Sequence, residues 1–386
     1  MAILGELVII KGGGTPSKQV PEYWGGSIPW ASVKDFKSTE LEKTIDCITE
    51  LGLNNSSATL VPAGTVVVPT RMALGKVAKT SVDMAINQDL KALLIKDESV
   101  INKNYLIRFL ESQAKYIERQ GKGATVKGIR LEALRALEVP LPPIEKQERL
   151  AAILDKADLL RKKRKQAIEL IDQFLQSVFL DMFGDPSTNL KNWRKGSIRD
   201  LVSEAKYGTS GKANSDKGEF PILRMGNITY SGGLDLSKLK YIDIEQKNHE
   251  KYLVRNGDLL FNRTNSKALV GKTAIYDREE SMALAGYLIR VRTNEFGNPY
   301  YLSGYLNSRH GKTTLLSICK SIIGMANINA QEMQNIPILL PPVDLQNRFE
   351  EITKVAKANL LKYEYSLQSL DELFASLSQR AFSGHL

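Results

Sequence analysis

Two long stretches of this chain carry apolar residues at alternating spacings of three and four, with no internal proline or glycine. The first follows a Pro-Pro pair and runs from Pro142 to Phe183. Such spacing places the apolar side chains on one face of a helix and is typical of a coiled-coil seam. Since a new helix can begin directly after a proline pair, the pattern predicts one long helix. Its apolar positions are Leu150, Ile153, Ala157, Leu160, Ala167, Ile171, Phe174 and Val178, and Arg164 interrupts them.

The second stretch, Pro341 to Phe382, repeats the first at a constant offset of 199 residues. Because one amphipathic helix cannot bury its own apolar stripe, the two copies predict that the helices pair with each other within the chain. At about 1.5 Å per residue, each helix reaches roughly 55 to 60 Å. That length suits a spacer, although two helices of a repeat bundle whose length has no function remain an alternative.

The segment before each long helix is also duplicated. Leu7, Val8, Gly14 and Thr15 recur at an offset of 194, and Tyr105, Leu106 and Leu110 recur at 196. Short apolar runs at 65–68, 91–95, 258–261 and 287–292 predict strands, and 104–120 and 300–318 predict helices. We therefore expect an α+β protein with two similar mixed α/β domains separated by a coiled coil of two long helices. The expected order is a globular domain at 1–141, a helix at 142–184, a globular domain at 185–340 and a helix at 341–386.

The two globular copies differ mainly in their polar loop residues. Trp30, Ser32 and Val33 align with Arg224, Gly226 and Asn227, and the loop 70–76 aligns with 263–272. Equivalent scaffolds with different polar loops are expected of two readers of two different short sequences. Divergence of a duplicated domain without such a role would give the same pattern.

Composition and charge favour a polyanionic partner. Lys and Arg number 53 against 43 Asp and Glu, which gives a net charge of +10 and a pI near 9.3. No apolar run reaches the roughly 18 residues of a membrane span, and no basic segment precedes the apolar residues at the N-terminus. We expect a cytoplasmic protein without membrane contact. Two cysteines and three scattered histidines predict neither a disulfide framework nor a metal site.

Several catalytic motifs are present only in part. His310 to Thr313 resembles the end of a phosphate-binding loop, but Leu306 occupies the position that requires the first glycine. Asn298-Pro299-Tyr300 resembles the tetrapeptide of amino-methylating DNA methyltransferases, yet it lacks the second proline. We therefore expect no catalytic residues in this chain. A stand-alone DNA methyltransferase or nuclease, and a coiled-coil adaptor without a DNA role, stay open as alternatives.

The openings PLPPIEKQERLAAILDKAD and LLPPVDLQNRFEEI, with IPWASVKDF and ILRMGNITY, resemble the specificity subunit of type I restriction-modification systems. The resemblance implies two target-recognition domains that each read one half of a split DNA sequence, separated by an antiparallel coiled coil of two long helices that sets the gap between the halves. It implies as partners double-stranded DNA, two modification subunits that methylate adenine N6, and restriction subunits. The chain itself would hold no cofactor, because S-adenosylmethionine, ATP and Mg²⁺ would lie on those subunits.

Candidate contact residues follow from this resemblance and from the chemistry of base edges and phosphates. For any single candidate, a solvated charge or a turn residue is the more common role, and a tryptophan such as Trp30 is more often a core residue. The DNA-binding candidates are Lys18, Trp30, Lys34, Arg71 and Lys76 in the first domain and Lys212, Arg224, Asn227, Arg263, Asn265, Lys267 and Lys272 in the second. The candidates for subunit contact are Gln147, Arg149, Gln346 and Arg348.

Overall fold

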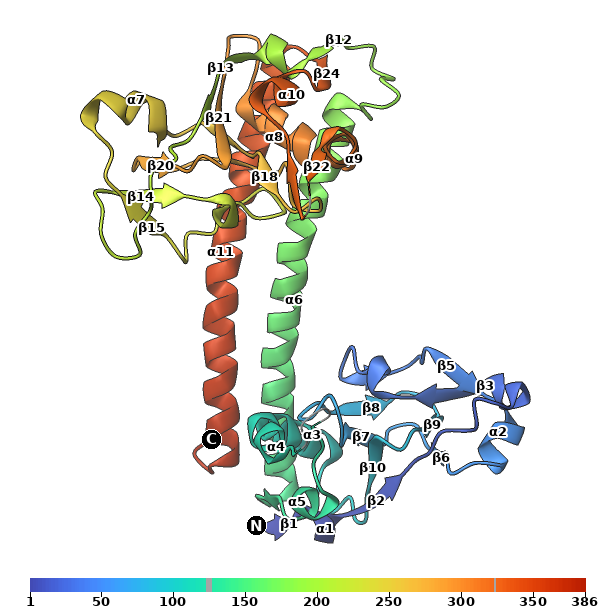
Figure 1. The fold of residues 1–386 in the computed structure, drawn as a ribbon. Helices are drawn as coiled ribbons and strands as arrows, with labels where there is room; N and C mark the ends of the chain where they lie inside the picture. Colours follow the sequence, from blue (N-terminus) through green and yellow to red (C-terminus); the bar gives the residue numbers. More distant parts are fainter. Residues whose placement is uncertain (123–126, 323) are drawn as a thin grey trace. The chain divides into compact units, whose positions relative to one another are not determined.

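A computed structural model describes residues 1–122, 127–322 and 324–386. It divides into two compact units, the first made of residues 1–164 and 366–386 and the second of residues 165–365. Each unit holds one globular domain together with one part of each long helix (Figure 1).

The two long helices, α6 (Ile144–Phe183) and α11 (Val343–Phe382), each begin directly after a Pro-Pro pair. In the first unit, the beginning of α6 packs antiparallel to the end of α11, where Phe374, Leu377 and Phe382 join the core. In the second unit, the end of α6 packs against the beginning of α11, and the rings of Phe179 and Phe349 lie 5.5 Å apart. The predicted antiparallel pair is confirmed.

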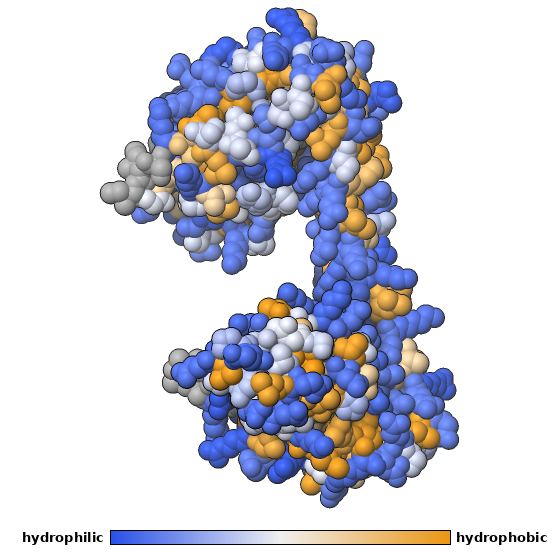
Figure 2. All heavy atoms as spheres, turned by 90° about the vertical axis from the view of Figure 1, so that its right-hand side faces the viewer, coloured by the Kyte–Doolittle hydropathy of each residue, from blue (hydrophilic) through white to orange (hydrophobic). Residues whose placement is uncertain are grey.

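The buried face of α6 differs from the predicted seam. Leu154 and Phe183 are buried at 0% and 1% exposure, whereas the seam positions Leu160 and Phe174 are 47% and 51% exposed. Each end of the helix packs into the core of a globular domain, so the domain decides which face is buried there. Between the ends the helix surface is mainly hydrophilic, with separate hydrophobic residues (Figure 2).

The first unit contains two small mixed sheets and a short strand pair. One sheet has the order β2-β10-β7-β8-β4, and the other β5-β3-β9-β6; β4–β8 and β3–β9 are their parallel pairs. The strands are β1 (Ala2–Ile3), β2 (Val8–Gly12), β3 (Trp24–Ala31), β4 (Glu40–Leu41), β5 (Asp46–Ile48), β6 (Thr59–Val61), β7 (Val66–Pro69), β8 (Ala78–Thr80), β9 (Met84–Ile86), β10 (Leu90–Ile95) and β11 (Glu138–Val139). The short helices are α1 (Leu4–Leu7), α2 (Glu50–Asn54), α3 (Lys103–Ser112), α4 (Ala114–Gln120) and α5 (Leu131–Arg135).

The second unit repeats this topology. Its sheets β13-β21-β17-β19 and β15-β14-β20-β16 match β2-β10-β7-β8 and β5-β3-β9-β6, and the pair β12–β24 matches β1–β11. The sheet β18-β23-β22 has no counterpart in the first unit's described sheets. The strands are β12 (Arg194–Ser197), β13 (Val202–Tyr207), β14 (Phe220–Leu223), β15 (Lys240–Ile242), β16 (Leu253–Val254), β17 (Leu259–Asn262), β18 (Thr264–Asn265), β19 (Thr273–Ile275), β20 (Met282–Leu284), β21 (Leu288–Thr293), β22 (Lys320–Ile322), β23 (Met325–Asn327) and β24 (Pro337–Leu340). The short helices are α7 (His249–Tyr252), α8 (Pro299–Asn307), α9 (Arg309–Ile318) and α10 (Ala330–Gln334).

The predicted α+β duplication is confirmed, and the four predicted strands match β7, β10, β17 and β21 within one residue at each end. The helix predicted at 104–120 is divided into α3 and α4, and the helix predicted at 300–318 is divided into α8 and α9. The break between α8 and α9 lies at Ser308, whose hydroxyl accepts a hydrogen bond from the Gly311 N–H at 3.0 Å and so begins a new helix. No helix in the described part of the chain is long and apolar enough to cross a membrane.

Candidate nucleic-acid interface

A recess of about 770 Å³ opens in the second unit between the end of β14, the loop after β13 and the segment around β18. We refer to it as the second-unit recess. Four residues singled out from the sequence line it, namely Arg224, Arg263, Asn265 and Lys272. Arg224 is distant in the chain from the other three, so the fold brings together a set of hydrogen-bond donors suited to base edges and phosphates.

Arg263 is the most firmly positioned of these side chains. Its guanidinium lies over the ring of Tyr207, with 4.8 Å from Cζ to the centroid. Its two terminal nitrogens donate long hydrogen bonds of 3.4 Å to the Gly286 carbonyl and the Asn327 amide oxygen. Its Nε is buried and has no partner among the described residues. The Arg263 side chain is therefore held in one orientation, and its Nε–H can still donate a hydrogen bond.

Two other predicted residues hold the turn at the edge of the recess. Asn227 is 3% exposed, accepts from the Arg224 N–H at 2.9 Å and donates to the Asp235 carbonyl at 2.8 Å. Lys272 is 7% exposed and donates to the carbonyls of Met225 and Ile228. Burial lowers the pKa of Lys272. Both side chains are used to shape the turn that presents Arg224, whose Nη2 donates to the Lys238 carbonyl at 3.0 Å.

The remaining second-unit candidates lie at the surface. Lys212 and Lys267 are exposed, and Asn265 is half-buried in the wall of the recess. Exposed lysines suit phosphate contacts, because an ammonium on a flexible stem binds an anion without fixed geometry.

In the first unit, Trp30 is a core residue. It is 6% exposed, its indole N–H donates to the Gly14 carbonyl at 3.0 Å, and its ring meets Trp24 edge to face at 5.1 Å. Lys18 and Lys34 are exposed. The Arg71 side chain is 64% exposed and lies 3.7 Å from the Asp89 carboxylate.

The structure corrects the alignment of Trp30 with Arg224, which is wrong by two residues. Trp30 pairs with Ala85 in β9, and Ile222 pairs with Ala283 in β20, so Trp30 corresponds to Ile222. The following turns then match: Asp35 accepts from the Ser32 N–H as Asn227 accepts from the Arg224 N–H. Lys76 and Lys272 also correspond, and they donate to the carbonyls of Phe36 and Ile228 respectively.

A family model, "Type I restriction modification DNA specificity domain", matches residues 2–170 and again residues 190–359. The chain belongs to this family. It is a DNA specificity subunit of a type I restriction-modification system and is non-catalytic.

The chain is similar to the type I restriction enzyme MjaIX specificity subunit of Methanocaldococcus jannaschii. The two are 20% identical, over 98% of this chain and 91% of the relative. The fold resembles the crystal structure of the type I restriction-modification S subunit from M. genitalium, with a TM-score of 0.60, 16% identity and coverage of 98% and 95%. A structure from work on complex assembly of a type I system gives a TM-score of 0.59, with 17% identity and coverage of 100% and 97%.

The glutamines predicted for subunit contact in this specificity subunit lie inside the two units. Gln147 and Gln346 are 1% and 0% exposed, and each uses both side-chain polar atoms within its own unit. Arg149 and Arg348, two residues further along each helix, are exposed. Only the arginines are therefore accessible to a partner without rearrangement.

The sequence reasoning missed two tyrosines, one that lines the second-unit recess and one that contacts Arg263. Tyr207 supports Arg263 and is 41% exposed, and Tyr287 lines the recess and is 52% exposed. The sequence holds no signal that separates them from Tyr301 and Tyr305, which are buried. Within the described ranges, no three His, Cys, Asp or Glu residues are grouped closely enough to hold a metal ion.

Proposed function

We propose that this specificity subunit reads a split DNA sequence, one half with each globular domain. Two modification subunits would then methylate adenine N6 at that target, using S-adenosylmethionine bound to themselves. Restriction subunits with ATP and Mg²⁺ would cleave unmethylated DNA.

The observation that carries this proposal is that the two globular domains share one topology but have different side chains at equivalent turns. The turn after β3 has Ser32 and Asp35 where the turn after β14 has Arg224 and Asn227. One scaffold thus presents two chemistries, as expected if the domains read two different half-sites. The net charge of +10 supports a DNA partner.

The positions of the candidate residues suggest a division of labour. We assign base-edge contacts to Arg224, Arg263 and Asn265, because arginine suits guanine and asparagine suits adenine. Exposed cations would contact phosphates and set affinity. This second group is Lys18, Lys34, Arg71, Lys212 and Lys267. Trp30, Lys76, Asn227 and Lys272 support the loops that carry these groups.

Helix α6 and helix α11 would serve as the spacer between the half-sites and as the docking surface for the modification subunits. Arg149 and Arg348 are exposed at equivalent positions near the starts of the two helices. Two equivalent surfaces in one chain suit two copies of one partner.

The test is to co-express the chain with its modification subunit in a host without other methylation and to map methyladenine by sequencing. We expect methylation at one split sequence, and only when both proteins are present. Methylation by either protein alone, or at a continuous sequence, would contradict the proposal.

A further inference from the structure

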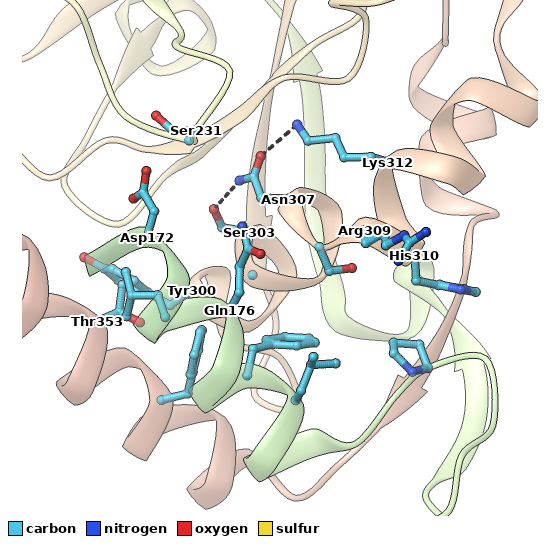
Figure 3. A pocket seen from close by; sticks show the side chains of 18 of the residues that line it. Asp172, Gln176, Ser231, Tyr300, Ser303, Asn307, Arg309, His310, Lys312 and Thr353 are labelled. Atoms are coloured by element: carbon cyan, nitrogen blue, oxygen red, sulfur yellow. Dashed lines mark hydrogen bonds between the residues drawn. The ribbon is translucent and has the colours of Figure 1, made fainter. Parts of the chain in front are cut away.

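A second cavity, of about 960 Å³, lies in the second unit among α6, α8, α9 and α11 and beneath the loop 230–232. Its floor is apolar and includes Leu175, Phe179 and Phe349, while Gln176, Ser303 and Asn307 supply polar groups (Figure 3). A volume of several hundred Å³ with an apolar floor and a few polar groups is typical of a site for a small organic molecule.

Two hydrogen-bond donors on α11 line this cavity without an acceptor. Thr353 is 7% exposed, and its hydroxyl has no hydrogen-bond partner in the described structure. Lys357 has no hydrogen bond or ion pair with any described residue; its ammonium lies 5.8 Å from the centroid of the Tyr300 ring. Burial lowers the pKa of Lys357, and Asp277 and Asp172 partly oppose this. Because residues four apart share one helix face, one oxyanion could accept from both donors.

A second cation lies at another part of the wall. The Lys312 ammonium donates to the Asn307 side-chain oxygen at 3.0 Å and lies 4.7 Å from the centroid of the Tyr230 ring. The Asn307 amide in turn donates to the Ser303 hydroxyl at 3.4 Å (Figure 3). Among the described residues, no carboxylate lies within ion-pair distance of Lys312 or Lys357. The lining also includes Arg309, Asp172 and Asp185, so its Lys and Arg side chains outnumber its carboxylates by three to two.

The first unit fills the equivalent place with its own side chains. Arg108 of α3 is 10% exposed and pairs with Glu111 at 2.8 Å, Asp155 at 2.7 Å and Asp158 at 3.3 Å. Arg161 and Lys162 also pair with Asp158, at 3.2 and 3.0 Å, so three cations face three carboxylates in the first unit.

The second unit has two neutral residues and two lysines at the corresponding positions. At the offset of 196, Gly304 and Asn307 stand for Arg108 and Glu111; at 199, Lys354 and Lys357 stand for Asp155 and Asp158. A Cβ on Gly304 would lie 2.8 Å from the Phe179 ring and 2.9 Å from the Phe349 ring, so no longer side chain fits there. The second unit therefore has no counterpart of the Arg108 guanidinium, and it has lysines where the first unit has Asp155 and Asp158.

We propose that this cavity binds a small organic monoanion, whose carboxylate, sulfonate or phosphodiester group accepts hydrogen bonds from Thr353 and Lys357. The rest of the ligand is flat and apolar and packs on Leu175 and Phe179. A single negative charge suits the site better than two, because Asp172 also lines the cavity.

The test uses anilinonaphthalene sulfonate, a flat fluorescent monoanion, with the full chain, and phenylnaphthylamine as the uncharged counterpart. We expect Lys357→Met to weaken binding of the sulfonate by about tenfold or more and Thr353→Val by severalfold, since a hydrogen bond to a charged group is lost. Lys357→Arg should retain most of the affinity. Lys354→Met is the matched control, because Lys354 is exposed, lies one turn away and pairs with Glu350 at 2.5 Å.

The proposal would be overturned if Lys357→Met bound the sulfonate as tightly as the wild type does. It would also be overturned if Lys354→Met lost as much sulfonate affinity as Lys357→Met. Binding of the uncharged probe should not change in any variant. If it falls together with that of the sulfonate, the site is an apolar patch without anion recognition and the proposal fails. If Lys357→Met does not fold, the other two variants test the proposal. Weaker sulfonate binding by Thr353→Val, with most of the affinity kept in Lys357→Arg, supports it, and unchanged binding by Thr353→Val overturns it.

Discussion

The side-chain oxygen of Gln147 accepts a hydrogen bond from the backbone N–H of Asn102 at 2.9 Å, which joins the start of α6 to the start of α3. The Gln147 amide donates to the carbonyls of Val100 and Pro142, both at 2.9 Å. Gln346 repeats the contact in the second unit and accepts from Asn298 at 2.8 Å. One buried glutamine per unit therefore fixes the beginning of each long helix against its globular domain.

We expect Gln147→Leu to lower the free energy of unfolding by about 2 to 4 kcal/mol, because it leaves several buried backbone groups without partners. Arg149→Ala, at an exposed position of the same helix, should change stability by no more than about 0.5 kcal/mol. Chemical denaturation of both variants measures the difference. Similar stability of the two variants would show that the glutamine does not hold the helix start.

Arg161 and Asp371 join α6 to α11 within the first unit, with 2.6 Å from Nε to the carboxylate oxygen. The Arg161 guanidinium also lies 4.4 Å from the Phe374 ring centroid. Since both side chains are partly exposed, a double-mutant cycle with Arg161→Met and Asp371→Asn should give a coupling of about 0.5 to 1 kcal/mol at low salt. The coupling should decrease in high salt; a coupling of zero at low salt would contradict the contact.

Burial, and next the nearby Lys272, lower the pKa of Lys312 from its ordinary value of 10.5 to about 8. Below pH 8 both the folded and unfolded chains carry the proton, and the folded state bears the full cost of the buried charge. Between pH 8 and 10.5 the folded chain loses that proton first, so the cost disappears as the pH rises. We expect Lys312→Met to raise the melting temperature most below pH 8, and progressively less toward pH 10.5. Lys267→Met, at an exposed position, is the control. A rise in the melting temperature of Lys312→Met that does not depend on pH would contradict the lowered pKa of Lys312.

Substitutions in the second-unit recess should separate base reading from phosphate binding. Arg263→Leu should weaken binding to the cognate sequence by about 1 to 3 kcal/mol while non-cognate binding changes little. Lys267→Ala should weaken both and reduce the slope of log affinity against log salt by about one. Titrations of fluorescent duplexes with the methylating complex at several salt concentrations measure both effects. Equal losses on cognate and non-cognate DNA for Arg263→Leu would remove it from the base-reading group.

Much of the architecture follows from the sequence, because duplication and helix periodicity are local or repeated signals. The beginnings of α6 and α11 follow from the Pro-Pro pairs, and the strands follow from short apolar runs. The burial of individual positions does not, because the exposure of Leu160 and Phe174 depends on where each domain packs on the helix. The alignment of Trp30 failed because strand pairing, not residue type, fixes the register of β3.

The candidate site was harder to predict for a physical reason. Arg224, Asn227 and Lys272 carry similar polar groups, yet the fold uses Asn227 and Lys272 to bind backbone carbonyls and leaves Arg224 at the recess. Composition does not distinguish a lysine that supports a turn from one that faces solvent. The cavity beneath loop 230–232 likewise depends on four helices meeting, which no single segment reveals.

Exchange of one globular domain tests the central claim, that each domain reads one half of a split target, most directly. Residues 1–141 are replaced by the corresponding domain of a specificity subunit with a different target, and methyladenine is mapped in the host genome. We predict that the methylated sequence is still split. One half should differ from the wild-type target, and the other half should be the same as in the wild type. A change in both halves, or in neither, would contradict the account.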